Sequence, residues 1–219
     1  GGPDIYGFGD GSEGPATIAT NTTVNDSQAL VGTASAASTT VLVTDGTSFP
    51  PGTLVLIHQT AGASTPTTFV QPPPLIDAGA LGVGHYEFAR VAGQTAGLLT
   101  LDAPLVNSYG PGAQIVRTPE YSALTIDAAV QAPAWDGTSG GIVVLAVDGD
   151  LVLNGTVDAA GRGFRAGPQD PSNGYSGNCS TTSDDFSGSY KGDGFAGFGT
   201  VGRGTLGNGG GGGNCGNAG

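Results

Sequence analysis

The sequence predicts an all-β protein, built as a short right-handed parallel β-helix with an inserted small antiparallel β-barrel and a glycine-rich, loop or polyglycine-type extension. Two observations favour strands: no segment repeats apolar residues at helical spacing over more than two turns, and Thr, Val, Gly and Pro dominate the chain. A third observation, a repeated motif, predicts the β-helix. The extension follows from composition, because glycine makes up 20 of the 59 residues after position 160 but only 22 of the 160 before it.

The motif occurs three times and predicts the coils of the β-helix. Its pattern is an aliphatic residue, any residue, Thr or aliphatic, Asn or Asp, any residue, a small residue, Val and a polar residue. The copies are Ile18–Asn25, Leu124–Gln131 and Leu151–Asp158. Asn or Asp in the middle tolerates a left-handed or Asx-turn conformation, which bends a strand and lets both arms point an aliphatic side chain inward. We expect Val24, Val130 and Val157 to stack, as in successive coils.

A separate unit interrupts the repeat. The first and second copies are 106 residues apart, whereas the second and third are 27 apart. Short apolar segments separated by turn residues predict an antiparallel barrel in this insertion. We therefore divide the chain into an N-terminal segment with the first coil (1–38), the barrel (39–120), further coils (121–160) and the glycine-rich extension (161–219). The expected strands are Thr39–Val43, Thr53–His58, Tyr86–Val91, Leu98–Leu101, Gln114–Arg117, Ala123–Ile126, Ile142–Val147 and Asp150–Leu153.

Charge and composition narrow the function. The 219 residues carry 18 acidic and 6 basic side chains, for a formal net charge of −12, so no basic stripe can neutralise phosphates and nucleic acid is not expected as a partner. No apolar run reaches the roughly 18 residues that cross a bilayer, so no membrane span is expected. The chain has no Met and no charged-then-apolar leader, which favours a processed, exported protein. We expect an extracellular or cell-surface location.

Two cysteines, Cys179 and Cys215, lie in a Gly, Ser and Asn-rich stretch that cannot bury them well. The pair predicts a disulfide formed in an oxidising compartment, with free thiols or an intermolecular link as the alternatives. Closing a loop of about 36 residues would stabilise the fold by roughly 4 kcal/mol. We expect the extension to be ordered, and to pack over the end of the β-helix or against another subunit.

Candidate metal ligands lie between these cysteines. Asp184, Asp185 and Asp193 could order the loop around Ca²⁺ with carboxylate and carbonyl oxygens, although dispersed carboxylates also serve solubility alone. The segment matches neither an EF-hand loop nor the nonapeptide calcium repeat. No other cofactor is expected, because the glycine patterns that resemble a dinucleotide fingerprint lack the strand-then-helix context.

The sequence predicts no catalytic residue. His85 and Glu87 would share a strand face if the strand already includes position 85, but this pair and His58 are interpreted as structural or surface groups. Ser139 stands in a formal G-x-S-x-G motif that lacks the strand and helix of a nucleophile elbow, and it is interpreted as part of a tight turn. Turn chemistry also explains the aspartates near the coils, which are Asp127, Asp136, Asp148, Asp150 and Asp158.

Six segments that together extend along nearly the whole chain carry a family resemblance. They are Phe49–Gln59, Tyr86–Val91, Ala132–Gly141, Asn154–Gly167, Lys191–Gly197 and Gly207–Gly219. These segments resemble the N-terminal module of large glycine-rich secreted surface proteins, of the adhesin type, from gliding and social bacteria. The resemblance implies an extracellular structural or adhesive role and no known catalytic residues.

We therefore expect a non-catalytic extracellular structural or adhesive surface protein that self-assembles into a fibre or matrix. Its expected partners are other copies of itself, as a homo-oligomer or filament, and surface polysaccharide. The alternative is a carbohydrate-active β-helix enzyme or a carbohydrate-binding module. An enzyme needs a cleft with convergent carboxylates of perturbed pKa, whereas a structural protein needs an extended contact surface.

Overall fold

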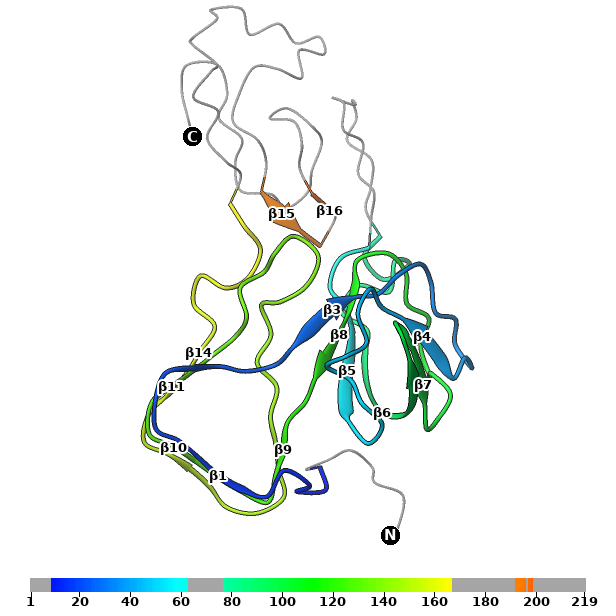
Figure 1. Ribbon diagram of the computed structural model, residues 1–219. Coiled ribbons are helices and arrows are strands. Elements are labelled where there is room, and N and C mark those ends of the chain that lie inside the picture. Colours follow the sequence, from blue (N-terminus) through cyan, green and yellow to red (C-terminus); the bar gives the residue numbers. More distant parts are fainter. Residues whose placement is uncertain (1–8, 63–76, 167–191, 196, 199–219) are drawn as a thin grey trace, which may run out of the picture. The chain divides into compact units, whose positions relative to one another are not determined.

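The computed structural model describes residues 9–62, 77–166, 192–195 and 197–198, and every regular element in these ranges is a strand (Figure 1). The all-β prediction is therefore confirmed for this part of the chain. The chain forms two compact units, residues 1–59 with 84–163 and residues 60–83 with 164–219. Among the described residues, no helix has the length and apolar character needed to cross a membrane.

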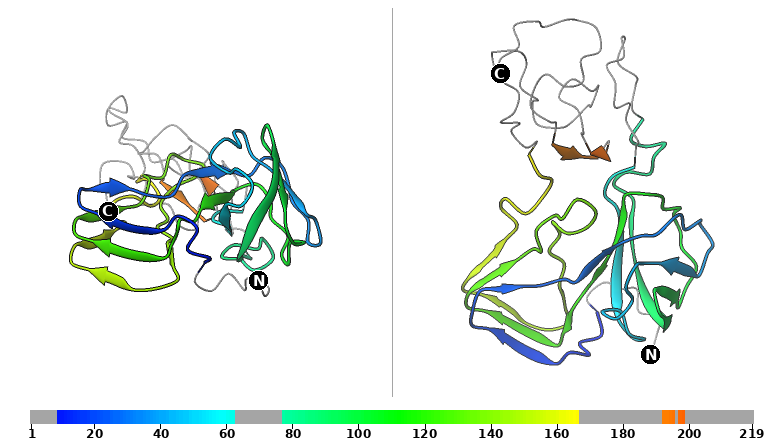
Figure 2. Two further views of the ribbon diagram at one scale, coloured as in Figure 1. Left: turned by 60° about the horizontal axis from the view of Figure 1, so that its bottom comes forward. Right: turned by 45° about the horizontal axis from the view of Figure 1, so that its top comes forward.

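The first unit contains a set of parallel strands that we call the parallel stack. Successive passes of the chain lie on one another in it (Figure 2). One sheet has the order β1 (Pro15–Ile18), β10 (Ala123–Ile126), β13 (Leu151–Leu153). A second has β2 (Thr22–Thr23) and β14 (Thr156–Asp158) on either side of β11 (Ala129–Gln131), and a third pairs β9 (Glu120–Tyr121) with β12 (Ala146–Val147).

The second and third motif copies pair in the predicted register. Leu124 pairs with Leu151 and Val130 pairs with Val157, in parallel, at the shift of 27 residues that the sequence repeat gives. Both aliphatic positions of the motif therefore occupy equivalent places in successive passes. This part of the repeat prediction is confirmed.

The first motif copy is displaced by two residues from its predicted register. Ile18 pairs with Ile126, and Thr22 rather than Val24 pairs with Val130. A slip of two residues keeps every side chain on the same face of its strand, so the alternation of the motif does not reveal it. The expectation that Val24 pairs with Val130 is wrong for this reason.

The bend between the two sheets is built as the motif predicts in the second and third copies. The Asn154 side-chain amide donates a hydrogen bond to Asp127 Oδ1 (2.8 Å), so the polar corner residues of two passes form a ladder. Gly155 follows at a place where the passes approach closely, because a Cβ there would overlap the carbonyl oxygen of Ala128. Only glycine fits this corner.

The core of the parallel stack is small and lies in its middle pass. Leu124, Ile126 and Val130 are 1%, 1% and 0% exposed and pack against partly buried side chains from the neighbouring passes. The last pass is different, because its large apolar side chains are about half exposed. They are Leu151 (55%), Val152 (45%), Leu153 (54%) and Val157 (50%).

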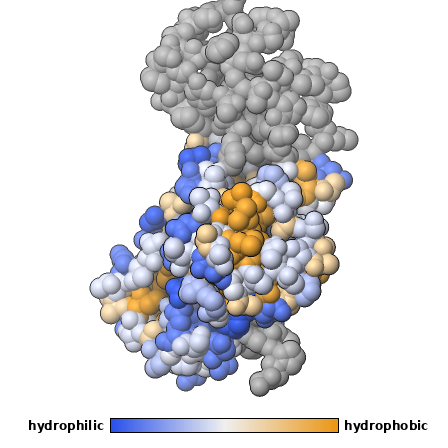
Figure 3. All heavy atoms as spheres, turned by 45° about the vertical axis from the view of Figure 1, so that its right-hand side comes forward, coloured by the Kyte–Doolittle hydropathy of each residue, from blue (hydrophilic) through white to orange (hydrophobic). Residues whose placement is uncertain are grey.

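The predicted insertion forms a six-stranded antiparallel sheet, which we call the curled sheet. Its order is β3 (Ser27–Ala29), β8 (Ala113–Arg117), β5 (Leu54–Gln59), β6 (Tyr86–Thr95), β7 (Leu98–Leu101), β4 (Thr40–Leu42). The sheet curls so far that Leu30 and Val43, which follow its two edge strands, meet in an antiparallel bridge. Its buried side encloses the larger core of the unit, with Phe49, Ile57, Leu99 and Ile115 each fully buried. Apolar atoms also gather on one outer face of the molecule (Figure 3).

Two predicted boundaries differ from the structure. The curled sheet begins at Ser27–Ala29, whereas the sequence placed the start of the barrel at residue 39. Of the predicted strand Ile142–Val147, only Ala146–Val147 is a strand. Both backbone groups of Val144 instead bond to the side chain of Asn25, which replaces a neighbouring strand as the partner.

The second unit contains one described hairpin. β15 (Asp193–Gly194) pairs antiparallel with β16 (Gly197–Phe198), and Gly62 donates its backbone N–H to the carbonyl of Phe195 (3.0 Å). Most of the predicted extension, 161–219, lies outside the described residues, and its expected order stays a prediction.

Candidate functional site

The chain passes between the parallel stack and the curled sheet twice, from β2 to β3 and from β8 to β9, and Asn25 fixes the first crossing. Its φ of 72° is left-handed. Its amide donates hydrogen bonds to the carbonyls of Arg117 (2.8 Å) and Val144 (2.6 Å), and its Oδ1 accepts the N–H of Val144 (3.0 Å). Asn25 is 6% exposed, so one buried side chain satisfies three backbone groups and holds both crossings together.

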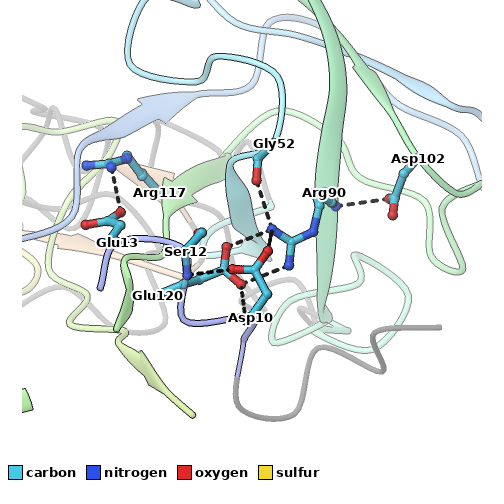
Figure 4. Close-up of polar contacts among 8 residues, drawn as sticks. All are labelled: Asp10, Ser12, Glu13, Gly52, Arg90, Asp102, Arg117 and Glu120. Carbon is cyan, nitrogen blue, oxygen red and sulfur yellow. Dashed lines mark hydrogen bonds and ion pairs between the residues drawn. The ribbon is translucent and has the colours of Figure 1, made fainter. Parts of the chain in front are cut away.

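A buried ion pair joins the two sheet systems at the second crossing. Arg90 of β6 donates to both carboxylate oxygens of Glu120 of β9, each at 2.8 Å, and also to the carbonyl of Gly52 (2.8 Å) (Figure 4). The Arg90 and Glu120 side chains are 17% and 3% exposed. A two-bond fork of this kind is both strong and directional. It fixes the position of β9 relative to β6.

Asp10 extends this group, which we call the junction cluster: Asp10, Arg90 and Glu120. Its Oδ2 lies 3.2 Å from Arg90 Nη1, its Oδ1 accepts the N–H of Ser12 (2.9 Å), and its own N–H donates to Glu120 (3.0 Å). The hydrogen bonds from Ser12 and the positive charge of Arg90 lower the pKa of Asp10 below its usual value of 3.8. The cluster therefore carries ionised carboxylates that a guanidinium compensates.

A polar groove of about 490 Å³ lies where the crossings leave the parallel stack, and we call it the junction groove. The side chains that give it its chemistry are Glu13, Asn25, Asp26, Arg117, Tyr121 and Asp136. A second hollow of about 330 Å³ lies over the junction cluster and shares Glu13 and Arg117 with the junction groove. Both hollows are thus built by residues from segments far apart in the sequence.

The groups in the junction groove are only partly used by the fold. Arg117 Nη2 and Glu13 Oε1 form an ion pair of 2.7 Å between side chains that are 36% and 32% exposed. Burial and the charge of Glu13 raise the pKa of Tyr121, so its hydroxyl stays protonated at neutral pH. Within the described part of the chain, neither the Tyr121 hydroxyl nor the Asp26 carboxylate forms a hydrogen bond. The groove therefore offers unused donors and acceptors.

Most of the metal and disulfide residues predicted from the sequence cannot be placed. Cys179, Cys215, Asp184 and Asp185 lie outside the described residues. Asp193 is described, and its Oδ2 forms an ion pair with Arg165 Nε (2.7 Å). No group of three or more His, Cys, Asp or Glu side chains suited to a metal occurs in the ranges that the structure describes. The disulfide and the calcium site stay predictions.

The histidines and Glu87 do not form a pair. Glu87 accepts the backbone N–H groups of Val106 (2.8 Å) and Asn107 (3.0 Å), so it caps a loop. His85 precedes β6 and makes no hydrogen bond or ion pair with Glu87. His58 lies in β5, where burial lowers its pKa. The interpretation of Glu87 as a structural group is confirmed.

Turn chemistry explains Ser139 and two of the aspartates, as predicted. Asp136 Oδ1 accepts the backbone N–H groups of Thr138 (2.7 Å) and Ser139 (2.9 Å), which is an Asx-type turn. Asp158 Oδ1 accepts the N–H of Ala160 (2.8 Å) in the same manner. Ser139 is 6% exposed and lies in a turn rather than between a strand and a helix.

Sequence reasoning missed the residues that build both hollows. Arg90 and Glu120 are 30 positions apart, and Glu13 and Arg117 are 104 apart, so no local spacing links the partners. One signal was available. The chain has only 6 basic residues, so an arginine inside a predicted strand needs an acidic partner.

No protein-family model matches the chain, and no curated protein does. Three solved structures are similar to part of it. The tailspike of Acinetobacter baumannii bacteriophage AP22, solved in complex with A. baumannii capsular saccharide, has 9% identity and a TM-score of 0.32 over 64% of this chain and 28% of that one. The Pseudomonas phage LKA1 tailspike has 12% identity and a TM-score of 0.30, over 64% and 26%. The Pseudomonas phage phi297 tailspike has 10% identity and a TM-score of 0.32, over 66% and 36%. The chain spans about a quarter to a third of the length of these tailspikes.

Proposed function

We propose that this chain is a non-catalytic structural or adhesive protein of an extracellular surface, and that it works by joining the end of its parallel stack to another copy. The observation that carries the proposal is the exposed last pass of the stack. Leu151 and Leu153 pair in register with Leu124 and Ile126, which are buried, yet they are 55% and 54% exposed. The next layer of the same kind of core is missing from the described part of the chain.

Two properties of this end favour association. β13 and β14 are edge strands, because each pairs with a stack neighbour on one side only among the described strands. Aliphatic side chains at positions 151, 152, 153 and 157 accompany this edge. An apolar edge with unpaired backbone groups is a template for pairing with another chain.

The sequence favours a second copy as the partner. One period of 27 residues after Leu151–Leu153 stand Asn178, Cys179 and Ser180, and the equivalents of Thr156–Asp158 are Ser183, Asp184 and Asp185. None of these is aliphatic. From residue 159 to residue 219 the only Leu, Ile or Val residues are Val201 and Leu206, too few for another pass of this type.

We also propose that the parallel stack is a short right-handed parallel β-helix. The parallel pairing of β1, β10 and β13 supports it, because each link between neighbouring strands must return to the same end of the sheet. Such crossovers between parallel strands are right-handed in about 98% of cases. A β-helix grows by adding coils at its ends, which suits assembly through the last pass.

The alternative, a carbohydrate-active enzyme, receives less support from the carboxylates. Glu120 is paired with Arg90, Glu13 with Arg117, and Glu87 accepts two backbone N–H groups. A glycoside hydrolase needs two carboxyl groups that face one bond of the substrate, one of them protonated. The paired carboxylates described above instead serve the fold.

The test combines assembly with activity. Sedimentation velocity and electron microscopy of the native chain should show concentration-dependent association that the double substitution Leu151→Glu with Leu153→Glu abolishes. Aspartates at positions 148 and 150 already flank this end, so Asp148→Asn with Asp150→Asn is the matched surface control and should keep association. A monomer at all concentrations, or release of new reducing ends from acidic or neutral polysaccharides, contradicts the proposal.

A further inference from the structure

We propose that the junction groove binds a neutral saccharide chain, through hydrogen bonds from sugar hydroxyls to Asp26, Tyr121 and Arg117. The inference rests on the proposed adhesive function and names the ligand class that adhesion would use. It depends on a different surface from the self-association, because none of these three residues belongs to the last pass of the parallel stack.

The free polar groups are of the kinds that a sugar needs. The Asp26 side chain is exposed and accepts no hydrogen bond from the described residues, and the Tyr121 hydroxyl is also unpaired among them. Arg117 uses Nη2 for Glu13, and within the described residues its Nε and Nη1 donate no hydrogen bond. Neighbouring hydroxyls of a pyranose donate to carboxylates and accept from guanidinium groups, so acceptors and donors on one wall match them.

The aromatic ring of Tyr121 adds an apolar surface to these polar groups. Tyr121 packs against the core of the parallel stack, formed by Leu124, Ile126 and Val130, and it also lines the groove. Its orientation is therefore held by the fold before any ligand arrives. A pre-positioned aromatic side chain loses little conformational entropy on binding.

The charge of the groove selects against acidic chains. Glu13, Asp26 and Asp136 contribute three carboxylates against the one guanidinium of Arg117, and the whole chain has a net charge of −12. A polyuronate would bring further negative charges into this field. A neutral saccharide avoids this repulsion and still uses every free group.

The groove is large enough and rigid enough for such a ligand. Its volume of about 490 Å³ lies within the range of small-molecule sites, about 300 to 1,000 Å³. Buried Asn25 fixes the backbone on one side through three hydrogen bonds. The Asx turn at Asp136 fixes the other side.

The test is a binding measurement on the full chain with defined probes. Maltohexaose, cellohexaose and mannohexaose are the neutral probes, hexagalacturonate is the acidic one, and hexalysine represents a basic peptide. We expect at least one neutral hexaose to bind and hexagalacturonate not to bind. Asp26→Asn and Tyr121→Phe should each weaken that binding by about three- to tenfold, the loss of one hydrogen bond.

Two matched controls carry the same chemical changes at exposed positions outside the groove. Asp150→Asn and Tyr86→Phe should change affinity less than twofold. Thermal unfolding of each variant shows whether it folds. Equal effects of Asp26→Asn and Asp150→Asn, binding of hexalysine alone, or binding of no neutral hexaose would overturn the inference. Self-association of the same samples is measured separately, so failure of the groove and failure of the proposed assembly give different results.

Discussion

Leu151 lies in register with Leu124, one pass of the chain away in the parallel stack, but Leu124 is 1% exposed and Leu151 is 55% exposed. The two residues occupy the same position of the same motif. The difference arises because Leu124 has neighbouring strands on both sides, β1 and β13, whereas β13 is an edge strand. The number of stacked passes, rather than the residue type, decides how much each leucine contributes to the monomer.

Alanine substitutions at these two positions should differ strongly in stability. Leu124→Ala removes buried contacts and leaves a cavity, so we expect the free energy of unfolding to fall by about 2 to 5 kcal/mol. Leu151→Ala should cost less than about 1 kcal/mol in the monomer, because its side chain is half in water. Urea denaturation at a concentration below any association measures both. Equal losses would show that the last pass is covered in the monomer.

The ion pair of the junction cluster should be worth more than the ion pair of the junction groove. Glu120→Gln leaves the guanidinium of Arg90 largely buried with a weaker partner, and we expect a loss of about 3 kcal/mol. Glu13→Gln makes the same change in a pair that is about one third exposed, and it should cost less than about 1 kcal/mol. Chemical denaturation of the two variants provides the comparison. A larger loss for Glu13→Gln would contradict the assigned role of Glu120.

Stability should fall on acidification in two separate steps. Burial lowers the pKa of His58 below its ordinary 6.5, so below that pH the unfolded chain binds a proton more readily than the folded one. The stability is therefore present above pH 6.5 and decreases as the pH falls below it. Asp10 acts in the same direction below its ordinary value of 3.8, since its lowered pKa keeps the folded form charged.

The melting temperature as a function of pH separates the two groups. His58→Gln should flatten the first step and leave the second, whereas Asp10→Asn should flatten only the second. Tyr86→Phe is a control that changes neither. A first step that persists in His58→Gln would assign it to another group.

Two substitutions of Asn25 separate its hydrogen bonds from its backbone conformation. Asn25→Gly keeps the left-handed φ accessible but removes three hydrogen bonds, and we expect a loss of about 2 to 3 kcal/mol. Asn25→Ala also forces a residue with a Cβ into that conformation, which should cost about 1 kcal/mol more. Denaturation midpoints measure the difference. Equal stability of the two variants would show that the backbone conformation carries no cost.

The strands of the curled sheet were predictable because their patterns are local. Leu98–Leu101 was placed to the residue, and Tyr86–Val91 and Gln114–Arg117 lie within the observed β6 and β8. Turn residues between short apolar segments set these limits. β3 at Ser27–Ala29 was missed because it has no large apolar residue and is a strand only through its pairing with β8.

The sequence by itself determined the all-β class, the 27-residue shift between the second and third coils and the turn roles of Asp136 and Asp158. These features depend on residues close together in the chain, or on the alternation of side chains within one strand. Only the tertiary structure decided that the first coil pairs two residues away from its motif, that Arg90 meets Glu120, and that Glu13, Asp26 and Tyr121 line one groove. The physical reason is that these relationships join segments up to 104 residues apart, and a shift that conserves the strand faces leaves the local pattern unchanged.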